Sequence, residues 1–199
     1  MKEVTDIVIM GVGGQGIILA TTILSEVALY SGFDVKTNEV HGMAQRGGSV
    51  ISQIRFGEKV YSPLVKNGEA ELFIGLEKLE ALRGLRFCNK DTVAIINNRE
   101  IYPITVSSGS ANYPKDADRI LKENINKLFI LDAEKIALDV GNIKTENVVM
   151  LGAASNFLPF ETEHFEKAIK NLVKQKYVDV NIAAFYKGRD VTNTNEQII

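Results

Sequence analysis

The feature that most constrains the fold is a glycine-rich segment near the N-terminus. Gly11, Gly13 and Gly16 follow the apolar run 7–10 and precede the apolar-rich segment 17–30, in the spacing G-x-G-x-x-G. Glycines tolerate positive φ and allow a helix or a ligand to approach the backbone closely, which suits a tight turn between a strand and a helix. The segment therefore predicts the first strand, turn and helix of a Rossmann-like fold.

Two interpretations of this turn are open on its sequence alone. The free N–H groups and the positive dipole end of the following helix favour an anion, so the turn could line a binding site. The same glycines also serve a turn that only packs, and the polar Gln15 suits either interpretation. The candidate residues for contact with a ligand or partner are Gly11, Gly13, Gly14, Gln15 and Gly16.

The rest of the chain alternates between strand patterns and helix patterns. This alternation predicts an α/β fold, a Rossmann-like three-layer sandwich with a mostly parallel sheet. We expect one domain over residues 1–190, an irregular hairpin within 49–62, an irregular connection over 101–114 and a polar, flexible tail over 191–199. The further expected strands are 34–40, 49–56, 70–76, 91–98 and 127–133, and the expected helices are 17–30, 77–85, 116–126, 134–139, 147–157, a segment beginning at Glu163, and 179–190.

Composition argues against several classes of protein. The formal net charge is −2 and the pI is about 5.8, so the chain lacks the basic field that nucleic-acid binding uses. The most apolar stretch, 16–30, includes Ser25 and Glu26 and is shorter than the roughly 20 apolar residues of a membrane span. No signal-peptide pattern precedes the first strand. We therefore expect a cytoplasmic protein that binds neither nucleic acid nor membrane.

The single cysteine limits the redox chemistry of this chain. Iron–sulfur clusters usually take about four Cys ligands, whereas Cys88 is accompanied only by His41 and His164. The sequence thus predicts no metal site, and a metal centre for redox chemistry would lie on another chain. Cys88 is expected to be a small buried hydrophobe and His164 a surface residue.

A second glycine-rich segment follows the strand expected at 34–40. The sequence HGMAQRGGS should emerge at the same edge of the sheet as the first turn. A guanidinium beside backbone N–H groups suits phosphate or carboxylate, whereas packing at a subunit interface is the alternative. No catalytic residue is assigned, because no Ser, Cys or carboxylate set accompanies the histidine of this loop. The candidate ligand- or partner-binding residues here are His41, Gln45, Arg46, Gly47 and Gly48.

The motifs described so far leave two alternative functions open. A Rossmann dehydrogenase places an acidic residue about 20 residues after its glycines, and Glu39 lies 23 residues after Gly16. That spacing would suit a stand-alone NAD(P)- or flavin-dependent oxidoreductase, but no substrate domain and no convincing acid/base set follows. The second alternative is an interaction module that only stabilises a larger enzyme.

Several stretches together resemble the gamma-type subunits and domains of 2-oxoacid:ferredoxin oxidoreductases. They are GVGGQGI, EVHGMAQRGGSVISQIRFG, VYSPLV, GEAELFIGLEKLEALR and VDVNIAAFYKGRD, and they lie within residues 5–190. The combination of G-x-G-G-Q-G with a later A-Q-R-G-G is more specific than either motif alone. The flanking stretches are most similar to the small subunit of the enzymes acting on indolepyruvate, whereas both glycine motifs are shared with pyruvate and 2-oxoglutarate relatives.

The resemblance implies oxidative decarboxylation of an aryl 2-oxoacid to an acyl-CoA, with electrons passed to ferredoxin. It implies that a large alpha-type partner subunit holds thiamine diphosphate and the Fe–S clusters, so that this chain alone binds no cofactor and is inactive. The single cysteine agrees with this division. The implied role is a scaffold whose two glycine loops face the partner's active site and help to orient CoA through binding.

Overall fold

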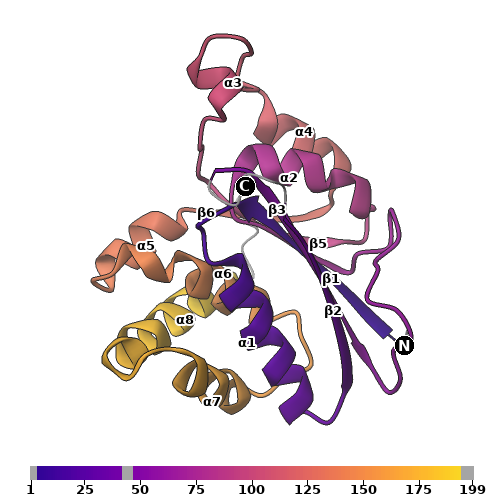
Figure 1. Cartoon of the computed structure of the whole chain (residues 1–199), viewed down its shortest axis with the longest axis vertical. Coiled ribbons are helices and arrows are strands. Elements are labelled where there is room, and N and C mark those ends of the chain that lie inside the picture. The colour runs from indigo at the N-terminus through magenta and orange to yellow at the C-terminus, as the bar shows by residue number, and fades with distance from the viewer. Residues whose placement is uncertain (1–3, 42–46, 194–199) are drawn as a thin grey trace.

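A six-stranded sheet with helices on both faces organises the computed structural model, which describes residues 4–41 and 47–193 (Figure 1). The strand order is β2-β3-β1-β4-β5-β6, and β1, β4, β5 and β6 pair in parallel. The predicted α/β fold with a mostly parallel sheet is confirmed. The strands are β1 (Val4–Val12), β2 (Asp34–His41), β3 (Ser49–Gly57), β4 (Leu72–Gly75), β5 (Val93–Asn97) and β6 (Lys127–Leu131).

The side chains of β1 alternate between two cores, because the strand is covered on both faces. Ile7 and Ile9 enter the larger core, and Val8 and Met10 enter the smaller one. The smaller core lies against α2 (Lys78–Gly84) and α4 (Ala117–Asn124). The larger core lies against α1 (Ile17–Tyr30), α5 (Ala133–Asp139), α6 (Glu146–Ser155), α7 (Thr162–Leu172) and α8 (Val178–Asn193).

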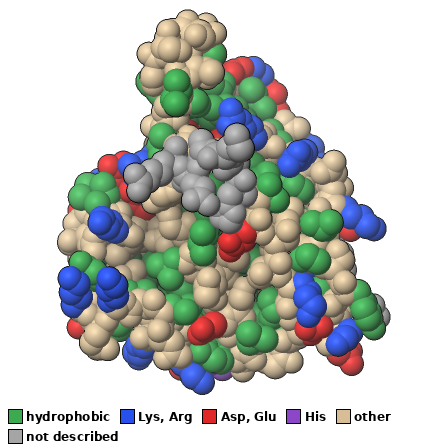
Figure 2. All heavy atoms as spheres, viewed as in Figure 1, with side chains coloured by type: hydrophobic (Ala, Val, Ile, Leu, Met, Phe, Trp, Pro, Cys, Tyr) green, Lys and Arg blue, Asp and Glu red, His purple; other side chains and the backbone are tan. Residues whose placement is uncertain are grey.

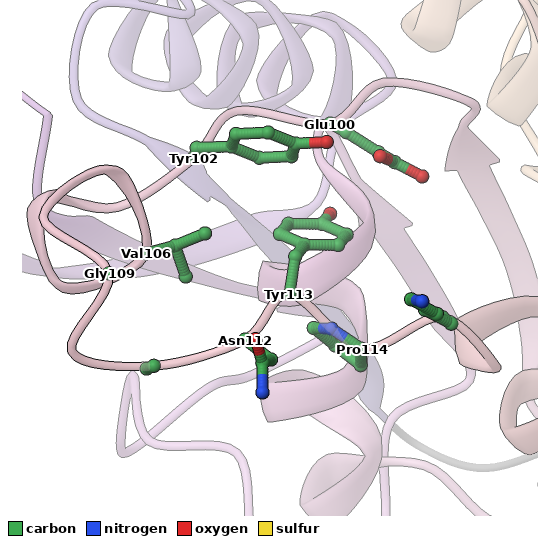
Figure 3. Close-up of a pocket in the computed structure, with 9 residues that line it drawn as sticks. Glu100, Tyr102, Val106, Gly109, Asn112, Tyr113 and Pro114 are labelled. Atoms are coloured by element: carbon green, nitrogen blue, oxygen red, sulfur yellow. The ribbon is translucent and has the colours of Figure 1, made fainter.

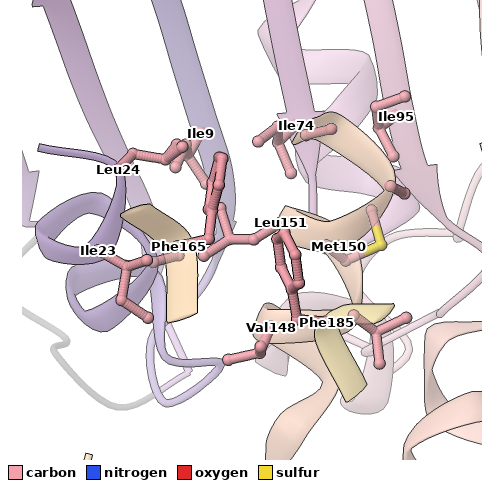
Figure 4. Packing of buried hydrophobic residues seen from close by; sticks show 14 of the residues in the cluster. Ile9, Ile23, Leu24, Ile74, Ile95, Val148, Met150, Leu151, Phe165 and Phe185 are labelled. Atoms are coloured by element: carbon pink, nitrogen blue, oxygen red, sulfur yellow. The ribbon is translucent and has the colours of Figure 1, made fainter. Parts of the chain in front are cut away.

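The larger core is closed by aromatic side chains from the last two helices. Figure 4 shows Phe165 of α7 and Phe185 of α8 beside Leu151 of α6, below the strands. The rings of Phe165 and Phe185 stack with centroids 4.9 Å apart, and both side chains are fully buried. Burying a Phe or Leu side chain contributes about 1.5–3 kcal/mol each, so this layer fixes the helices on the sheet.

The strand expected over 49–56 is confirmed as β3, so the irregular hairpin expected within 49–62 is wrong for its first half. β3 is a regular nine-residue strand that pairs antiparallel with β1 on one side and β2 on the other. It carries buried polar side chains that are satisfied: the Ser52 hydroxyl bonds the Thr21 hydroxyl at 2.7 Å, and Gln53 Oε1 accepts from Val65 N–H at 2.6 Å. Because Ser52 and Gln53 are polar, the sequence of β3 lacks the continuous apolar run that is typical of a strand inside a sheet.

The helices follow the predicted segments closely, and three short 3₁₀ turns, η1 (Leu85–Phe87), η2 (Ile143–Thr145) and η3 (Gln175–Tyr177), adjoin helices in the described chain. α8 continues to Asn193, so residues 191–193 of the expected tail are helical, and residues 194–199 lie outside the described residues. No helix within 4–41 and 47–193 is long and apolar enough to cross a membrane.

The connection between β5 and α4 projects from the body of the molecule. We call residues 99–115 the arm; it contains the single-turn helix α3 (Ile104–Ser107) and stands out at the top of Figures 1 and 2. Because the arm follows the carboxyl end of β5, it leaves the sheet at the edge where β1 and β2 also end. The expected irregular connection over 101–114 is thus observed, apart from the one helical turn.

Candidate ligand and partner site at the glycine turns

Two backbone hydrogen bonds join the two glycine segments. The Gly13 N–H donates to the Gly48 carbonyl at 2.8 Å, and the Gly47 N–H donates to the Gly13 carbonyl at 3.4 Å. These bonds continue the β1–β3 ladder beyond its last pair, Val12 with Ser49. We call these three glycines the glycine seam. The expectation that both loops emerge at one edge of the sheet is therefore met, and the loops are also in direct contact.

The first turn needs glycine at two positions for conformational reasons. Gly14 has φ of 104° and Gly16 has φ of 75°, a region that L side chains rarely adopt. A Cβ on Gly16 would lie only 2.6 Å from Asn147 Nδ2, which donates to the Gly16 carbonyl at 3.0 Å. Space around Gly14 is open. Gly16 is thus also a packing glycine, whereas the exposed Gly14 leaves its backbone accessible from outside.

Gln15 occupies the crevice between the carboxyl ends of β1 and β4. Its Oε1 accepts from the Val12 N–H at 2.7 Å, and its Nε2 donates to the Leu76 carbonyl at 2.8 Å. A Cβ on Gly11 would lie 2.8 Å from that same Oε1, so Gly11 makes room for the Gln15 side chain. Gln15 and Gly11 therefore have structural roles that explain their residue types without a ligand.

A cleft of about 620 Å³ opens beside the first turn, and we call it the turn cleft. Arg99, at the end of β5, forms ion pairs with Glu146 and, at 3.8 Å, with Glu134. Burial raises the pKa of the Glu146 carboxyl, while the hydrogen bond from Arg99 acts in the opposite direction. Lys144 adds a second cationic side chain. The cleft is lined by Val12, Gly13, Gly14, Gln15, Gly16, Leu19, Gly47, Arg99, Ile101, Ile143, Lys144, Glu146 and Asn147.

The residues that complete this cleft are not among the candidates predicted from the sequence. Arg99 lies two residues after the apolar strand β5, and a polar cluster at the carboxyl end of a parallel strand is a signal that could have identified it. Lys144 and Asn147 come from η2 and the start of α6, far from the glycine turn in sequence. No local pattern connects them to it.

Part of the second candidate set cannot be placed. Gly47 and Gly48 lie in the seam, and the backbone of His41 ends β2. Gln45 and Arg46 lie outside the described residues, as does the side chain of His41. The structure therefore brings the first turn together with Gly47 and Gly48 of the second segment, and the roles of these three side chains stay predictions.

The sheet order weakens the dinucleotide alternative. β3 lies between β1 and β2, so the strand that carries Glu39 is two strands from the glycine turn. At about 4.8 Å per strand the separation is roughly 10 Å instead of 5 Å. Glu39 is consequently too far along the sheet for the ribose contact that a Rossmann fingerprint places beside β1.

Cys88 and His164, the two other residues with reactive side chains, both contact groups of the fold itself. Cys88 is half-buried, its Sγ lies 3.7 Å from the Gly84 carbonyl, and burial raises the pKa of its thiol to about 12. His164 Nδ1 hydrogen-bonds the Ser31 hydroxyl at 2.9 Å. Among the residues that the structure describes, no group of three His, Cys, Asp or Glu could hold a metal ion.

Comparison with known proteins shows the family. Residues 6–191 match the model of the family described as pyruvate ferredoxin/flavodoxin oxidoreductase. The chain is 44% identical to the indolepyruvate oxidoreductase subunit IorB of Pyrococcus horikoshii over 193 residues, covering 94% of this chain and 95% of that protein.

Two solved structures share the fold. The gamma subunit of a keto/oxoacid ferredoxin oxidoreductase from Geobacter sulfurreducens superposes with a TM-score of 0.73 at 22% identity, over 96% of this chain and 97% of that one. A 2-oxoglutarate:ferredoxin oxidoreductase from Magnetococcus marinus, solved with 2-oxoglutarate, coenzyme A and succinyl-CoA, gives a TM-score of 0.78 at 16% identity, over 99% of this chain but 32% of that longer chain. The resemblance drawn from the sequence is confirmed, and the chain belongs to the pyruvate ferredoxin/flavodoxin oxidoreductase family.

Proposed function

We propose that this chain is the small subunit of an indolepyruvate:ferredoxin oxidoreductase. In the assembled enzyme an aryl 2-oxoacid loses CO₂, its acyl group forms a thioester with CoA, and two electrons pass to ferredoxin. The 44% identity to an IorB subunit over nearly the whole of both chains supports the indolepyruvate assignment. A pyruvate or 2-oxoglutarate oxidoreductase is the alternative within the same family.

The observation that carries the proposal is the glycine seam beside the turn cleft. The seam, the accessible backbone of Gly14, the paired guanidinium of Arg99 and the ammonium of Lys144 lie together at one edge of the sheet. Backbone donors and guanidinium groups suit phosphate and carboxylate groups. In the proposed complex this edge faces the partner's active site, and Arg46 adds a second guanidinium to it.

This chain contributes binding and orientation, not a reacting group. Thiamine diphosphate, bound by the large alpha-type subunit together with the Fe–S clusters, would act as the electron sink for decarboxylation. The Arg99–Glu146 pair holds the guanidinium at the cleft wall, and Asn147 holds the Gly16 carbonyl. A rigid wall of this kind lowers the entropic cost of placing CoA or the substrate carboxylate. We place the complex in the cytoplasm.

Reconstitution with the large subunit tests the function. We expect the two co-expressed chains to purify together and to reduce ferredoxin when supplied with indolepyruvate and CoA. The specificity constant should be higher for indolepyruvate than for pyruvate or 2-oxoglutarate. A preference for pyruvate would reject the substrate assignment while retaining the family role. If this chain bound no large subunit, its proposed role as the small subunit of a larger enzyme would be rejected.

Arg46 tests the site within that complex. Arg46→Lys keeps the charge but loses the planar fork, and losing such a charge-assisted contact costs roughly 1.5–3 kcal/mol, about ten- to a hundredfold in apparent affinity. We expect a higher KM for CoA or for the 2-oxoacid, with assembly and cluster content unchanged. Unchanged KM values for both ligands in fully assembled enzyme would remove Arg46 from the site.

A further inference from the structure

A single buried carboxylate closes the base of the arm. Glu77 is fully buried at the start of α2, and its Oε1 accepts from the Ile101 N–H at 3.1 Å and from the Tyr113 hydroxyl at 2.5 Å. The Tyr113 hydroxyl also accepts from the Leu79 N–H at 3.2 Å. Glu77 thus binds the first and last parts of the arm at one point. Burial, together with the Glu77 carboxylate, raises the pKa of Tyr113, which keeps its hydroxyl a donor.

The arm is also ordered by contacts of its own. The Ala111 N–H donates to the Thr105 carbonyl at 2.9 Å, which folds the tip back on itself. Figure 3 shows the ring of Tyr102 facing that of Tyr113, and the two centroids lie 5.2 Å apart. A segment closed at its base and bonded across its tip is preorganised, so it would lose little conformational entropy on binding.

The surface of the arm has the composition of a protein interface. No charged side chain occurs between Glu100 and Lys115, in a chain that is 24% charged. Ile104 is 86% exposed and Tyr102 is 57% exposed. Charge depletion with exposed aromatic and aliphatic side chains is typical of interface cores and does not suit nucleic acid, whose recognition depends on basic residues.

The arm and the glycine seam line a common cleft. This cleft of about 290 Å³ separates them, with Ile101, Pro103 and Ile104 on the arm side and Gly47 and Gly48 on the other. Ile101 also lines the turn cleft, so the surface is continuous from the first glycine turn to the arm. A partner that fills this cleft contacts both the seam glycines Gly47 and Gly48 and Ile104.

We propose that the arm is a preformed docking element for the large catalytic subunit, with Ile104 inserted into an uncharged pocket of that partner. The proposal rests on the proposed function, because it takes the partner to be the chain that covers the seam. The fold itself occurs within a longer chain in the Magnetococcus marinus enzyme, where it forms 32% of the length. That arrangement favours a large neighbouring protein surface over a small peptide as the occupant.

The test compares Ile104→Asp with Tyr61→Asp in the full-length chain. Tyr61 is 89% exposed and lies after β3, at the opposite edge of the sheet, so it is matched in exposure but not in position. We expect Ile104→Asp to raise the Kd for the large subunit about tenfold or more, the range for an interface anchor. Tyr61→Asp should leave it within about twofold, and both variants should unfold thermally like the wild type, because the changed side chains are exposed.

Each other outcome is decisive. Wild-type affinity in Ile104→Asp, or equal weakening by both variants, would overturn the docking role. Loss of self-association in Ile104→Asp with unchanged affinity for the large subunit would assign the arm to contacts between copies of this chain instead. If wild-type chain forms no complex with the large subunit, the proposed function fails first, and the docking role fails with it. A normal complex that tolerates Ile104→Asp overturns only the docking role.

Discussion

At the scale of single residues, the glycine turn is held by a side chain that was ambiguous from sequence. Gln15 uses both ends of its amide, accepting from Val12 N–H and donating to the Leu76 carbonyl. This bridge fixes the ends of β1 and β4 next to each other and explains why Gly11 lacks a side chain. The spacing of the glycines could be predicted from the sequence, but the partner of Gln15, 61 residues away, could not.

Gln15→Glu tests this bridge with an almost isosteric change. The carboxylate retains an acceptor for Val12 but faces the Leu76 carbonyl without a proton to donate, and we expect the free energy of unfolding to fall by about 1–3 kcal/mol at neutral pH. Urea unfolding of the isolated chain measures it. Gln175→Glu, at an exposed position, is the matched control and should change stability by less than about 0.5 kcal/mol. Equal effects of the two substitutions would contradict the bridge.

The thiol of Cys88 gives a prediction with a defined pH dependence. Burial raises the pKa of this thiol to about 12 in the folded chain, so far fewer molecules carry a thiolate at pH 8 than when the chain is unfolded. Alkylation by iodoacetamide should therefore be at least tenfold slower in the native chain than in urea. Because the folded pKa is raised, stability is fully retained below about pH 8.5 and declines as the pH rises toward 12. Equal labelling rates in the two states would refute the burial of this thiol.

At the scale of elements, the helices and strands that could be predicted from the sequence are those with a local pattern of apolar residues and glycines. α1 begins and ends at the predicted residues because apolar side chains fill it and Gly32, with φ of 83°, follows its end. The position of β3 was missed because it depends on pairing with β1 and β2, which are distant along the chain. Arg99 and Asn147 were likewise missed, since only the folded sheet brings them to the glycine turn.

The packing of α6 on α8 is another long-range feature that depends on two glycines. A Cβ on Gly152 would overlap the Phe185 carbonyl, and a Cβ on Gly188 would overlap the Val149 carbonyl. The two helix backbones are therefore in direct contact. Gly152 also follows the segment that carries Glu146 and Asn147, so this contact helps to position one wall of the turn cleft.

Gly152→Ala should separate these helices. The added methyl collides with backbone, which cannot rotate away, so we expect a loss of about 3 kcal/mol or more in the free energy of unfolding, at or beyond the upper end for overpacking. Thermal unfolding followed by circular dichroism measures it. Lys187→Ala, on the exposed side of α8, is the control and should be nearly neutral. Wild-type stability of Gly152→Ala would mean that the two helices can move apart at little cost.

At the scale of the whole molecule, the proposed site is one edge of the sheet. The seam, the turn cleft and the arm all follow the carboxyl ends of strands, where open α/β sheets bind ligands. The stretch VYSPLV, which contributed to the family resemblance, lies instead near the amino ends: the Val60 N–H donates to Asp34 at the start of β2. The stretches that carry the family resemblance therefore lie at two opposite edges of the sheet, and only one of these edges carries the proposed site.

This division predicts how activity is distributed between the chains. The isolated chain has one cysteine and, in its described residues, no cluster of metal ligands, so we expect it to purify without iron and to oxidise no 2-oxoacid. Mixing it with the separately purified large subunit should then restore CoA-dependent ferredoxin reduction, rising to a plateau at a fixed ratio of the two chains. The controls are iron analysis of each chain alone and the same ferredoxin-reduction assay on each chain alone. Stoichiometric iron in this chain, or 2-oxoacid oxidation without the partner, would show that it holds redox machinery of its own, and the assignment of the cofactors to the large subunit would then be wrong.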